Sequence, residues 1–206
     1  MTVHTKIDQA GSPIDDDALA KIFTEARTHN GFLEKPVSDD LLRRAIDIAK
    51  IGPTSANNSP LRVLFLKSKT AKERLRPFLA PGNLEKTMAA PVTAITAYDL
   101  KFYDHLPFLL PHADFKSYFA ALPVEEQREI AHKNGTLQVA YLIVALRAVG
   151  LDTGPMTGFD NQKLDAEFFP DGRFKSNVLI NIGYGDHTKL FPRSPRFSFE
   201  EMAQIL

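Results

Sequence analysis

The sequence predicts an α+β fold in which helices flank a small, mainly antiparallel sheet. Apolar residues recur at helical spacing in several segments, only three or four segments have the composition of strands, and polar turns separate them. The 206 residues are enough for one domain with a sizeable core. We therefore expect residues 1–206 to form a single domain, with residues 1–12 as a flexible arm.

Four helices are predicted in the first ninety residues, where apolar side chains form one-sided stripes. They cover residues 15–28, 39–51, 70–79 and 84–90. Ser38 is a suitable N-cap for the second helix, and Gly52 with Pro53 ends it. Thr70 and Glu73 have the spacing of a capping box at the start of the third helix.

Strands are predicted where short runs rich in β-branched residues lie between turns. They cover residues 62–67, 92–98 and 178–182. The tripeptide 81–83, Pro-Gly-Asn, predicts a turn between two helices. Residues 183–185, Gly-Tyr-Gly, predict a turn that ends the last strand, because too little chain follows for a βαβ unit.

A long helix is predicted over residues 124–149. Its second half, residues 137–146, is apolar nearly all round, so we expect it to be buried on all sides. In a chain of this size, a second subunit is the simplest cover for its far face. Asn161 and Ser198 are predicted to cap two further helices.

Residues 100–123 are rich in aromatic residues and proline, which predicts short helices. Two interpretations remain open for this segment. It forms either a flap or lid over a site, or a small satellite core.

Composition excludes several classes of function. Lys plus Arg and Asp plus Glu both number 25, and this balance does not favour nucleic acid or membrane surfaces as partners. The absence of cysteine excludes disulfides, thiolate metal sites and a Cys nucleophile. No serine-hydrolase or P-loop motif occurs, and we predict neither a metal site nor a catalytic side chain. Without a signal peptide or a membrane-length apolar run, the expected location is the cytoplasm.

The segment 52–60, Gly-Pro-Thr-Ser-Ala-Asn-Asn-Ser-Pro, carries the strongest functional signal. Pro53 and Pro60 bracket six small residues, and prolines stiffen such a loop. The dense set of short hydrogen-bonding groups suits a flat polar ligand such as the edge of a flavin ring. The alternative is a plain connection between a helix and a strand.

Three further segments could contribute to a binding site. Residues 27–32 form a basic and polar cluster after the first helix, and residues 154–160 are predicted to form a second rigid turn. Arg193 and Arg196 form a basic clamp near the C-terminus, and arginine forks suit a phosphate monoester. The alternative for each arginine is a solvated surface position.

Together, these segments resemble the FMN-dependent nitroreductase family. The resemblance runs along nearly the whole chain from about residue 15. Within the family, the chain is most similar to the HadB/RutE subgroup, which includes malonic semialdehyde reductase of pyrimidine catabolism. The matches to this subgroup lie in residues 26–31, 52–57, 151–156 and 181–186.

The resemblance implies a nitroreductase-like fold, an intertwined homodimer and two FMN sites at the interface. Hydride would pass from NADPH or NADH to the flavin N5 and then to an acceptor in a ping-pong cycle, so the flavin carries the chemistry. The residues that the resemblance assigns to FMN are Arg27, Thr28, His29, Asn30, Gly31, Pro53, Thr54, Ser55, Asn57, Asn83, Pro155, Met156, Thr157, Gly158, Arg193 and Arg196.

The expected reaction is reduction of malonic semialdehyde to 3-hydroxypropionate. One alternative is a broad nitro or quinone reductase, and another is a flavin-binding protein without turnover. Arg62 and His112 are candidates for the substrate carboxylate, with surface or packing roles as the alternative. The chain departs from the family pattern at Gly31, at residues 59–61 and at Thr157, which changes the pocket over the flavin.

Overall fold

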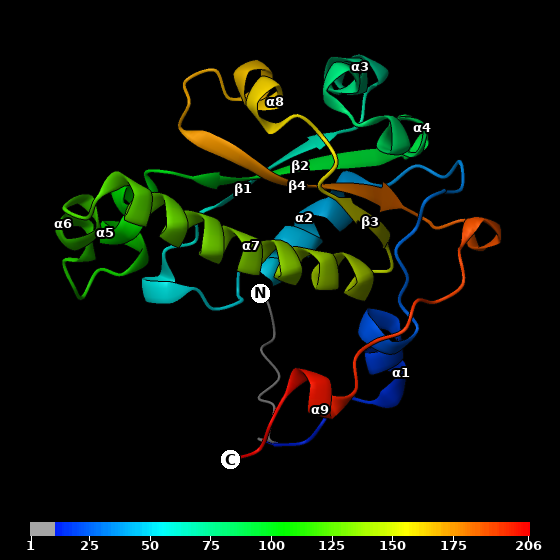
Figure 1. Cartoon of the computed structure of the whole chain (residues 1–206), viewed down its shortest axis with the longest axis horizontal. Coiled ribbons are helices and arrows are strands. Elements are labelled where there is room, and N and C mark those ends of the chain that lie inside the picture. The colour runs from blue at the N-terminus through cyan, green and yellow to red at the C-terminus, as the bar shows by residue number, and fades with distance from the viewer. Residues whose placement is uncertain (1–10) are drawn as a thin grey trace.

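The computed structural model describes residues 11–206, so the predicted arm over residues 1–12 lies almost wholly outside the described residues. Four antiparallel strands form one sheet in the order β1-β2-β4-β3 (Figure 1). The strands are β1 Leu61–Leu66, β2 Val92–Asp99, β3 Asp152–Met156 and β4 Phe174–Gly183. The predicted α+β class and antiparallel sheet are therefore confirmed.

Strand β2 lies inside the sheet, and all eight of its residues are buried. Helices cover both faces of the sheet (Figure 1). Helices α3 Lys69–Leu75, α4 Pro81–Ala89 and α8 Asn161–Phe168 lie on one face. Helices α2 Asp39–Ala49 and α7 Val124–Ala148 lie on the other. Each face has its own apolar cluster, with Leu142 and Ile180 in one and Leu75 and Leu179 in the other.

Helix α7 confirms the predicted long helix but is not buried all round. Leu142, Ala145 and Leu146 are in the core, whereas Leu137 is 42% exposed and Ala140 is also exposed. The apolar run forms a helix as predicted, but within one chain the sheet and α2 cover only part of the surface of this helix. An apolar face of α7 remains open.

The segment 100–123 forms short helices, as predicted: η4 Phe102–His105, α5 Leu106–Leu109 and α6 Phe115–Ala120. Phe102 and Leu106 are fully buried and pack with Phe119 against α7. The structure thus contains the satellite core that was one of the two interpretations. A lid function for this segment stays a prediction.

The first helix is shorter than predicted. It comprises α1 Asp16–Leu19 and a π-helical turn, η1 Ala20–Thr24. The prediction of a helix to Thr28 was wrong because Thr28 pairs with Thr153 at the edge of the sheet. This pairing draws the basic segment 27–30 out of the helix and alongside β3.

Three local predictions were also wrong, and in two of them a neighbouring residue is the N-cap. The N-cap of α3 is Ser68, whose Oγ accepts from the Ala71 N–H. Residues 81–83 are the first turn of α4, where Pro81 is tolerated because its nitrogen needs no partner. Asp160 rather than Asn161 caps α8.

The predicted rigid turn at 154–160 begins instead as strand. Residues 154–156 belong to β3 and pair with residues 179–181 of β4. Pro155 is accommodated because β3 is an edge strand, where one side needs no backbone donor. Ser198 does cap the last helix, α9 Phe199–Met202, as predicted, and no described helix is long and apolar enough to cross a membrane.

Candidate functional site

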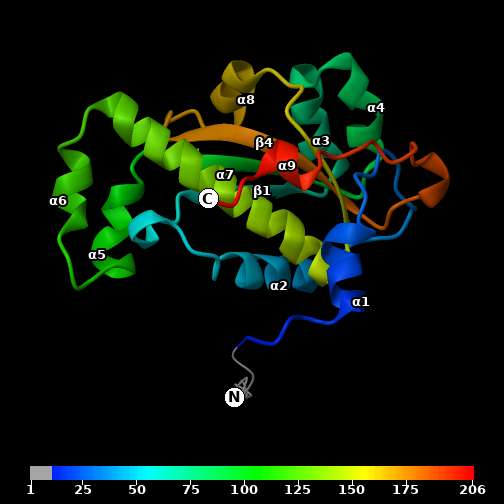
Figure 2. The ribbon, with the colours of Figure 1, turned by 60° about the horizontal axis from the view of Figure 1, so that its bottom comes forward.

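Two segments far apart in sequence form the walls of a cavity of about 630 Å³. Figure 2 shows the chain that follows α1 passing close to the chain that leads to α9, and hydrogen bonds join the two. Arg27 Nη2 donates to the Phe191 carbonyl at 2.5 Å, and Arg193 Nη2 donates to the Ala26 carbonyl at 3.4 Å. Each wall therefore supplies an arginine that reaches across to the other.

Positive charge dominates this arginine cavity. Its lining includes Arg27, Arg147, Arg193 and Arg196, and no carboxylate is among its described lining residues. Guanidinium groups bind phosphate through paired, charge-assisted hydrogen bonds. The arrangement is suited to an anionic ligand, with phosphate as the best match.

The early segment is held in place by the sheet. The His29 N–H donates to the Thr153 carbonyl at 3.0 Å, beside the bridge between Thr28 and Thr153. A side chain at Gly154 would meet the His29 carbonyl oxygen at 2.4 Å, so this close approach requires glycine. The backbone that carries Arg27 is thus fixed by β3.

Only part of the predicted early motif faces the cavity. Arg27, Thr28 and Asn30 line it, but the His29 ring is buried and lies 3.4 Å from Asp152 Oδ1. Burial lowers the pKa of His29, and Asp152 partly opposes this effect. Gly31 packs against Lys189 instead. The His29 side chain and Gly31 are therefore not placed for direct contact with a ligand in this cavity.

A second group of predicted residues adjoins the cavity through Asn30. Lys86 Nζ donates to Asn30 Oδ1 at 3.3 Å, and Asn83 Nδ2 donates to the Gly158 carbonyl at 2.8 Å. Lys86 and Asn83 lie one turn apart on α4, on the same side of the helix. This contact brings Asn83 and the end of β3 beside the early segment.

The sequence analysis missed two of these basic residues, Lys86 and Arg147. For Lys86 a signal existed, because a residue three positions after Asn83 shares its face on a helix. Because a turn was predicted at residues 81–83, Asn83 and Lys86 were not placed on one face of a helix. For Arg147 no signal existed, since an arginine at the end of an apolar helix is normally a solvated end residue.

The loop 53–60 is rigid, although it contains three strained residues. Ala56, Asn57 and Ser59 have φ values of 49°, 49° and 38°. Such angles are unfavourable for residues other than glycine and persist where many contacts hold them. Here Ser55 N–H donates to Asn134 Oδ1 at 2.9 Å, and Asn57 Nδ2 donates to the Leu109 carbonyl at 2.8 Å.

Within one chain, this loop does not meet the arginine cavity. Its hydrogen bonds to α7 involve Asn134, which accepts from the Ser55 N–H, and Tyr141, whose Oη donates to the Pro53 carbonyl at 3.1 Å, whereas the cavity residue on the same helix is Arg147. Arg147 lies six residues from Tyr141 and thirteen from Asn134, which is about 9 and 20 Å along the helix. The turn η2 Ser55–Asn57, drawn in cyan in Figure 1, lies near α5, where Asn57 bonds to the Leu109 carbonyl, and α5 lies toward the N-terminal end of α7. The predicted flavin contacts thus fall into two separate groups.

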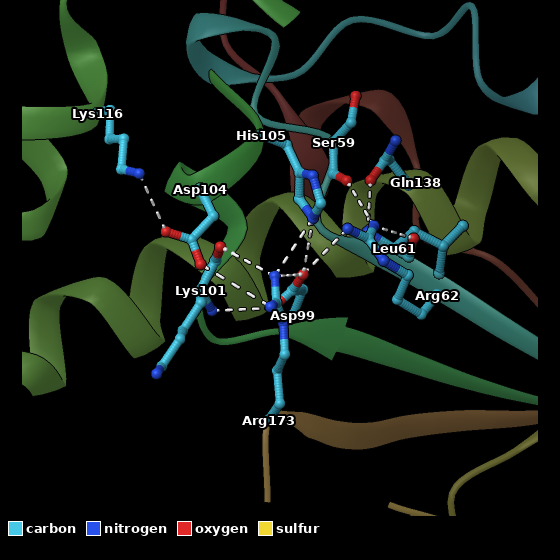
Figure 3. A network of polar contacts seen from close by, with 10 residues as sticks. All are labelled: Ser59, Leu61, Arg62, Asp99, Lys101, Asp104, His105, Lys116, Gln138 and Arg173. Atoms are coloured by element: carbon cyan, nitrogen blue, oxygen red, sulfur yellow. Dashed lines mark hydrogen bonds and ion pairs between the residues drawn. The ribbon is translucent and has the colours of Figure 1, made fainter. Parts of the chain in front are cut away.

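The two predicted substrate residues are also apart. Arg62 is held in a polar network, where its Nη2 lies 3.0 Å from Asp99 Oδ2 and its Nη1 donates to the Ser59 carbonyl at 3.1 Å (Figure 3). His112 is exposed and lines a different cavity of about 390 Å³ in the segment 100–123, together with Lys116. The structure gives Arg62 a clear role in holding the end of the loop.

Comparison with solved structures shows the same fold in other proteins. A protein of Exiguobacterium sibiricum, described as a nitroreductase and solved in complex with FMN, superposes with a TM-score of 0.80 at 18% identity, covering 96% of this chain and 100% of its own. A Staphylococcus epidermidis protein described as an NAD(P)H:FMN oxidoreductase gives 0.78 at 22% identity, covering 96% and 99%. The enone reductase CLA-ER of gut-bacterial fatty acid saturation gives 0.80 at 17% identity, covering 94% and 100%.

The sequence itself matches a family description. The model of the nitroreductase family aligns with residues 23–184, which include the whole sheet, α2, α7 and the segment 27–30 beside the arginine cavity. The chain therefore belongs to the nitroreductase family.

Proposed function

We propose that this protein is an FMN-dependent NAD(P)H oxidoreductase. The arginine cavity is the observation that carries the proposal, because its charge, size and donor set fit a phosphate monoester. Arg27, Arg193 and Arg196 would hold the phosphate, and Asn30, Lys86 and Asn83 would line the way toward the ring. Bound FMN would supply the hydride transfer between the nicotinamide and the acceptor.

The functional unit is proposed to be a homodimer with a shared site. The loop 53–57 of the partner subunit would edge the ring whose phosphate lies in the first chain's arginine cavity. This would account for the separation of the loop from the cavity within one chain, which is about 9 to 20 Å along α7. The open apolar face at Leu137 supports this arrangement, as does Ile51, which is 77% exposed.

The C-terminal segment provides a second support for the dimer. Phe199 and Ile205 are 57% and 85% exposed. Strand β1 is an outer strand, and cavities between it and α2 are lined by Ile46 and Phe65. We propose that the C-terminal segment of the partner subunit covers this edge.

The proposed acceptor is a small aldehyde that carries a carboxylate, with malonic semialdehyde as the specific candidate. The HadB/RutE-like segments support it. Arg62 is 32% exposed, so it remains accessible to a carboxylate although Asp99 holds it. A broad nitro or quinone reductase is the alternative.

A visible spectrum tests the cofactor. The purified protein should be yellow, should bleach with NADPH or NADH, and should regain colour with an aldehyde or nitro acceptor. Arg196→Glu places a carboxylate against the phosphate and should abolish the FMN load, whereas Arg44→Glu on the exposed side of α2 should not. A colourless wild type, or an Arg196→Glu protein with full FMN, would refute this assignment. A flavin that never bleaches would favour a binding protein without turnover.

Steady-state kinetics test the acceptor. Malonic semialdehyde, an uncharged aldehyde of equal size and a nitrofuran should be compared at saturating NADPH. A charge-assisted contact with the carboxylate is expected to favour malonic semialdehyde by about ten- to a hundredfold in kcat/KM. Equal or higher kcat/KM for the nitrofuran would support the broad nitroreductase instead.

A further inference from the structure

Arg147 is an arginine of the cavity that lies outside the four segments predicted to form the site. It lies in the last turn of α7 and lines the cavity beside Arg27. Its Nη1 donates to the Ile22 carbonyl at 3.0 Å. Its Nε is buried and has no hydrogen-bond partner among the described residues.

A buried N–H of a charged group without a protein partner is unfavourable, so a nearby anion would stabilise this guanidinium. Burial also lowers the pKa of Arg147, and the negative charge of Asp152 acts in the opposite direction by raising this pKa. Asp152 has other partners, because Oδ2 accepts from the Gly185 N–H and Oδ1 faces His29. The charge of Arg147 is therefore only weakly balanced within the chain.

We propose that Arg147 is a phosphate-binding residue that forms the inner wall of the FMN phosphate site. The proposal rests on the proposed function and adds a contact to it. The geometry suits an arginine fork, since Nη1 can keep its bond to the Ile22 carbonyl while Nη2, on the same edge of the guanidinium as Nε, donates to a phosphate oxygen.

The position of Arg147 differs from that of the C-terminal arginines. Arg193 and Arg196 lie on an exposed segment, whereas Arg147 is fixed at the end of a 25-residue helix packed on the sheet. A guanidinium that is already in place loses little side-chain freedom on binding. Arg147 would thus set the depth of the phosphate, and the C-terminal arginines would close over it.

Riboflavin separates this role from a purely structural one, because it has the ring and ribityl chain of FMN but no phosphate. Dissociation constants for FMN and riboflavin should be measured by flavin fluorescence on wild type, Arg147→Gln and Arg147→Lys, after removal of bound flavin. Arg44→Gln is the matched control, since it removes an exposed arginine outside the cavity.

We expect Arg147→Gln to weaken FMN about ten- to a hundredfold while its riboflavin affinity stays at the wild-type value. Arg147→Lys should lose part of the FMN preference, and Arg44→Gln none. Equal losses for both flavins, or an unchanged ratio in both variants, would overturn the proposal and show that Arg147 only holds the Ile22 segment. If Arg147→Gln does not fold, the ratio in Arg147→Lys decides. A wild type that binds neither flavin would instead refute the proposed function and this inference together.

Discussion

At the scale of single residues, the ring of His29 is tightly packed behind the segment 27–30 of the arginine cavity. The ring is 1% exposed and lies against Gly185, which follows β4. A Cβ at Gly185 would lie 2.0 Å from His29 Nδ1. The nearby ring therefore leaves no room for a side chain at position 185. The sequence had indicated only a turn there.

Gly185→Ala is expected to lower the free energy of unfolding by about 1–3 kcal/mol, because the buried ring must move. Chemical denaturation measures this change. Gly82→Ala is the matched control, since nothing lies within 4 Å of its Cβ and the residue is in α4, where alanine is favoured. A double variant with His29→Ala should recover part of the loss. Equal stability of Gly185→Ala and wild type would contradict the packing described for His29.

Lys72 predicts a pH dependence of stability. It is buried, its Nζ donates to the Met88 and Ala90 carbonyls at the end of α4, and burial lowers its pKa to about 8. The unfolded chain keeps this proton up to the ordinary lysine pKa of 10.5. Between these values the unfolded state binds more protons, so the free energy of unfolding should rise with pH by up to about 3 kcal/mol.

Urea denaturation at pH 8 and pH 10 should show this rise in wild type and in Lys69→Met, an exposed control on the same helix. Lys72→Met should lack it. The same rise in Lys72→Met would mean that another group is responsible.

At the scale of elements, Asp99 joins three parts of the structure (Figure 3). It is fully buried at the end of β2 and accepts from Arg173 Nε at 2.8 Å and from Arg62 Nη2 at 3.0 Å. It also accepts from the Lys101 N–H at 2.9 Å. One carboxylate thus connects the start of β1, the residue before β4 and the segment 100–123.

Asp99→Asn is expected to cost about 3–5 kcal/mol of folding free energy, because two partly buried guanidinium groups lose their counter-charge. Hydrogen exchange should accelerate most in residues 100–123 and in the loop 53–60. Glu129→Gln is the control, since Glu129 pairs with Lys133 at 3.2 Å on the surface of α7, and this change should alter stability by less than about 1 kcal/mol. Uniform acceleration across the sheet would show that Asp99 stabilises the whole fold rather than these elements.

At the scale of the whole molecule, the distribution of apolar surface supports the proposed homodimer. The open face of α7, the end of α2 and the C-terminal segment all expose large apolar side chains. Exposed apolar surface of this extent is characteristic of protein interfaces. The separation of the loop 53–60 from the arginine cavity also supports the proposed dimer, in which the two groups of residues contact one flavin from different subunits.

Leu137→Glu is expected to produce a folded monomer with a reduced FMN load. Leu137 is 42% exposed in the single chain, so the charge disturbs the proposed interface and leaves the core intact. Light scattering measures the mass, and circular dichroism checks the fold. Val124→Glu, 73% exposed at the start of α7, is the control and should stay dimeric. A monomeric wild type at micromolar concentration would refute the shared site.

The sequence alone determined the fold class, the long helix and the places of three of the four strands, although β4 begins four residues before its predicted start. It also singled out Arg27, Arg193 and Arg196, which line the arginine cavity. These features depend on local chemistry: apolar spacing for α7, β-branched residues for β2, and prolines and small polar residues for the loop 53–60. The same logic placed Ser38 and Ser198 as caps correctly.

Tertiary structure decided what depends on neighbours distant in sequence. Whether residues 154–156 form a turn or an edge strand depended on pairing with β4, and the first helix ends early because Thr28 pairs with β3. Arg62 acquired a carboxylate partner from β2, and Arg147 entered the cavity because α7 ends beside the early segment. Local patterns specify which residues can bind, but only packing brings their side chains together or turns them away.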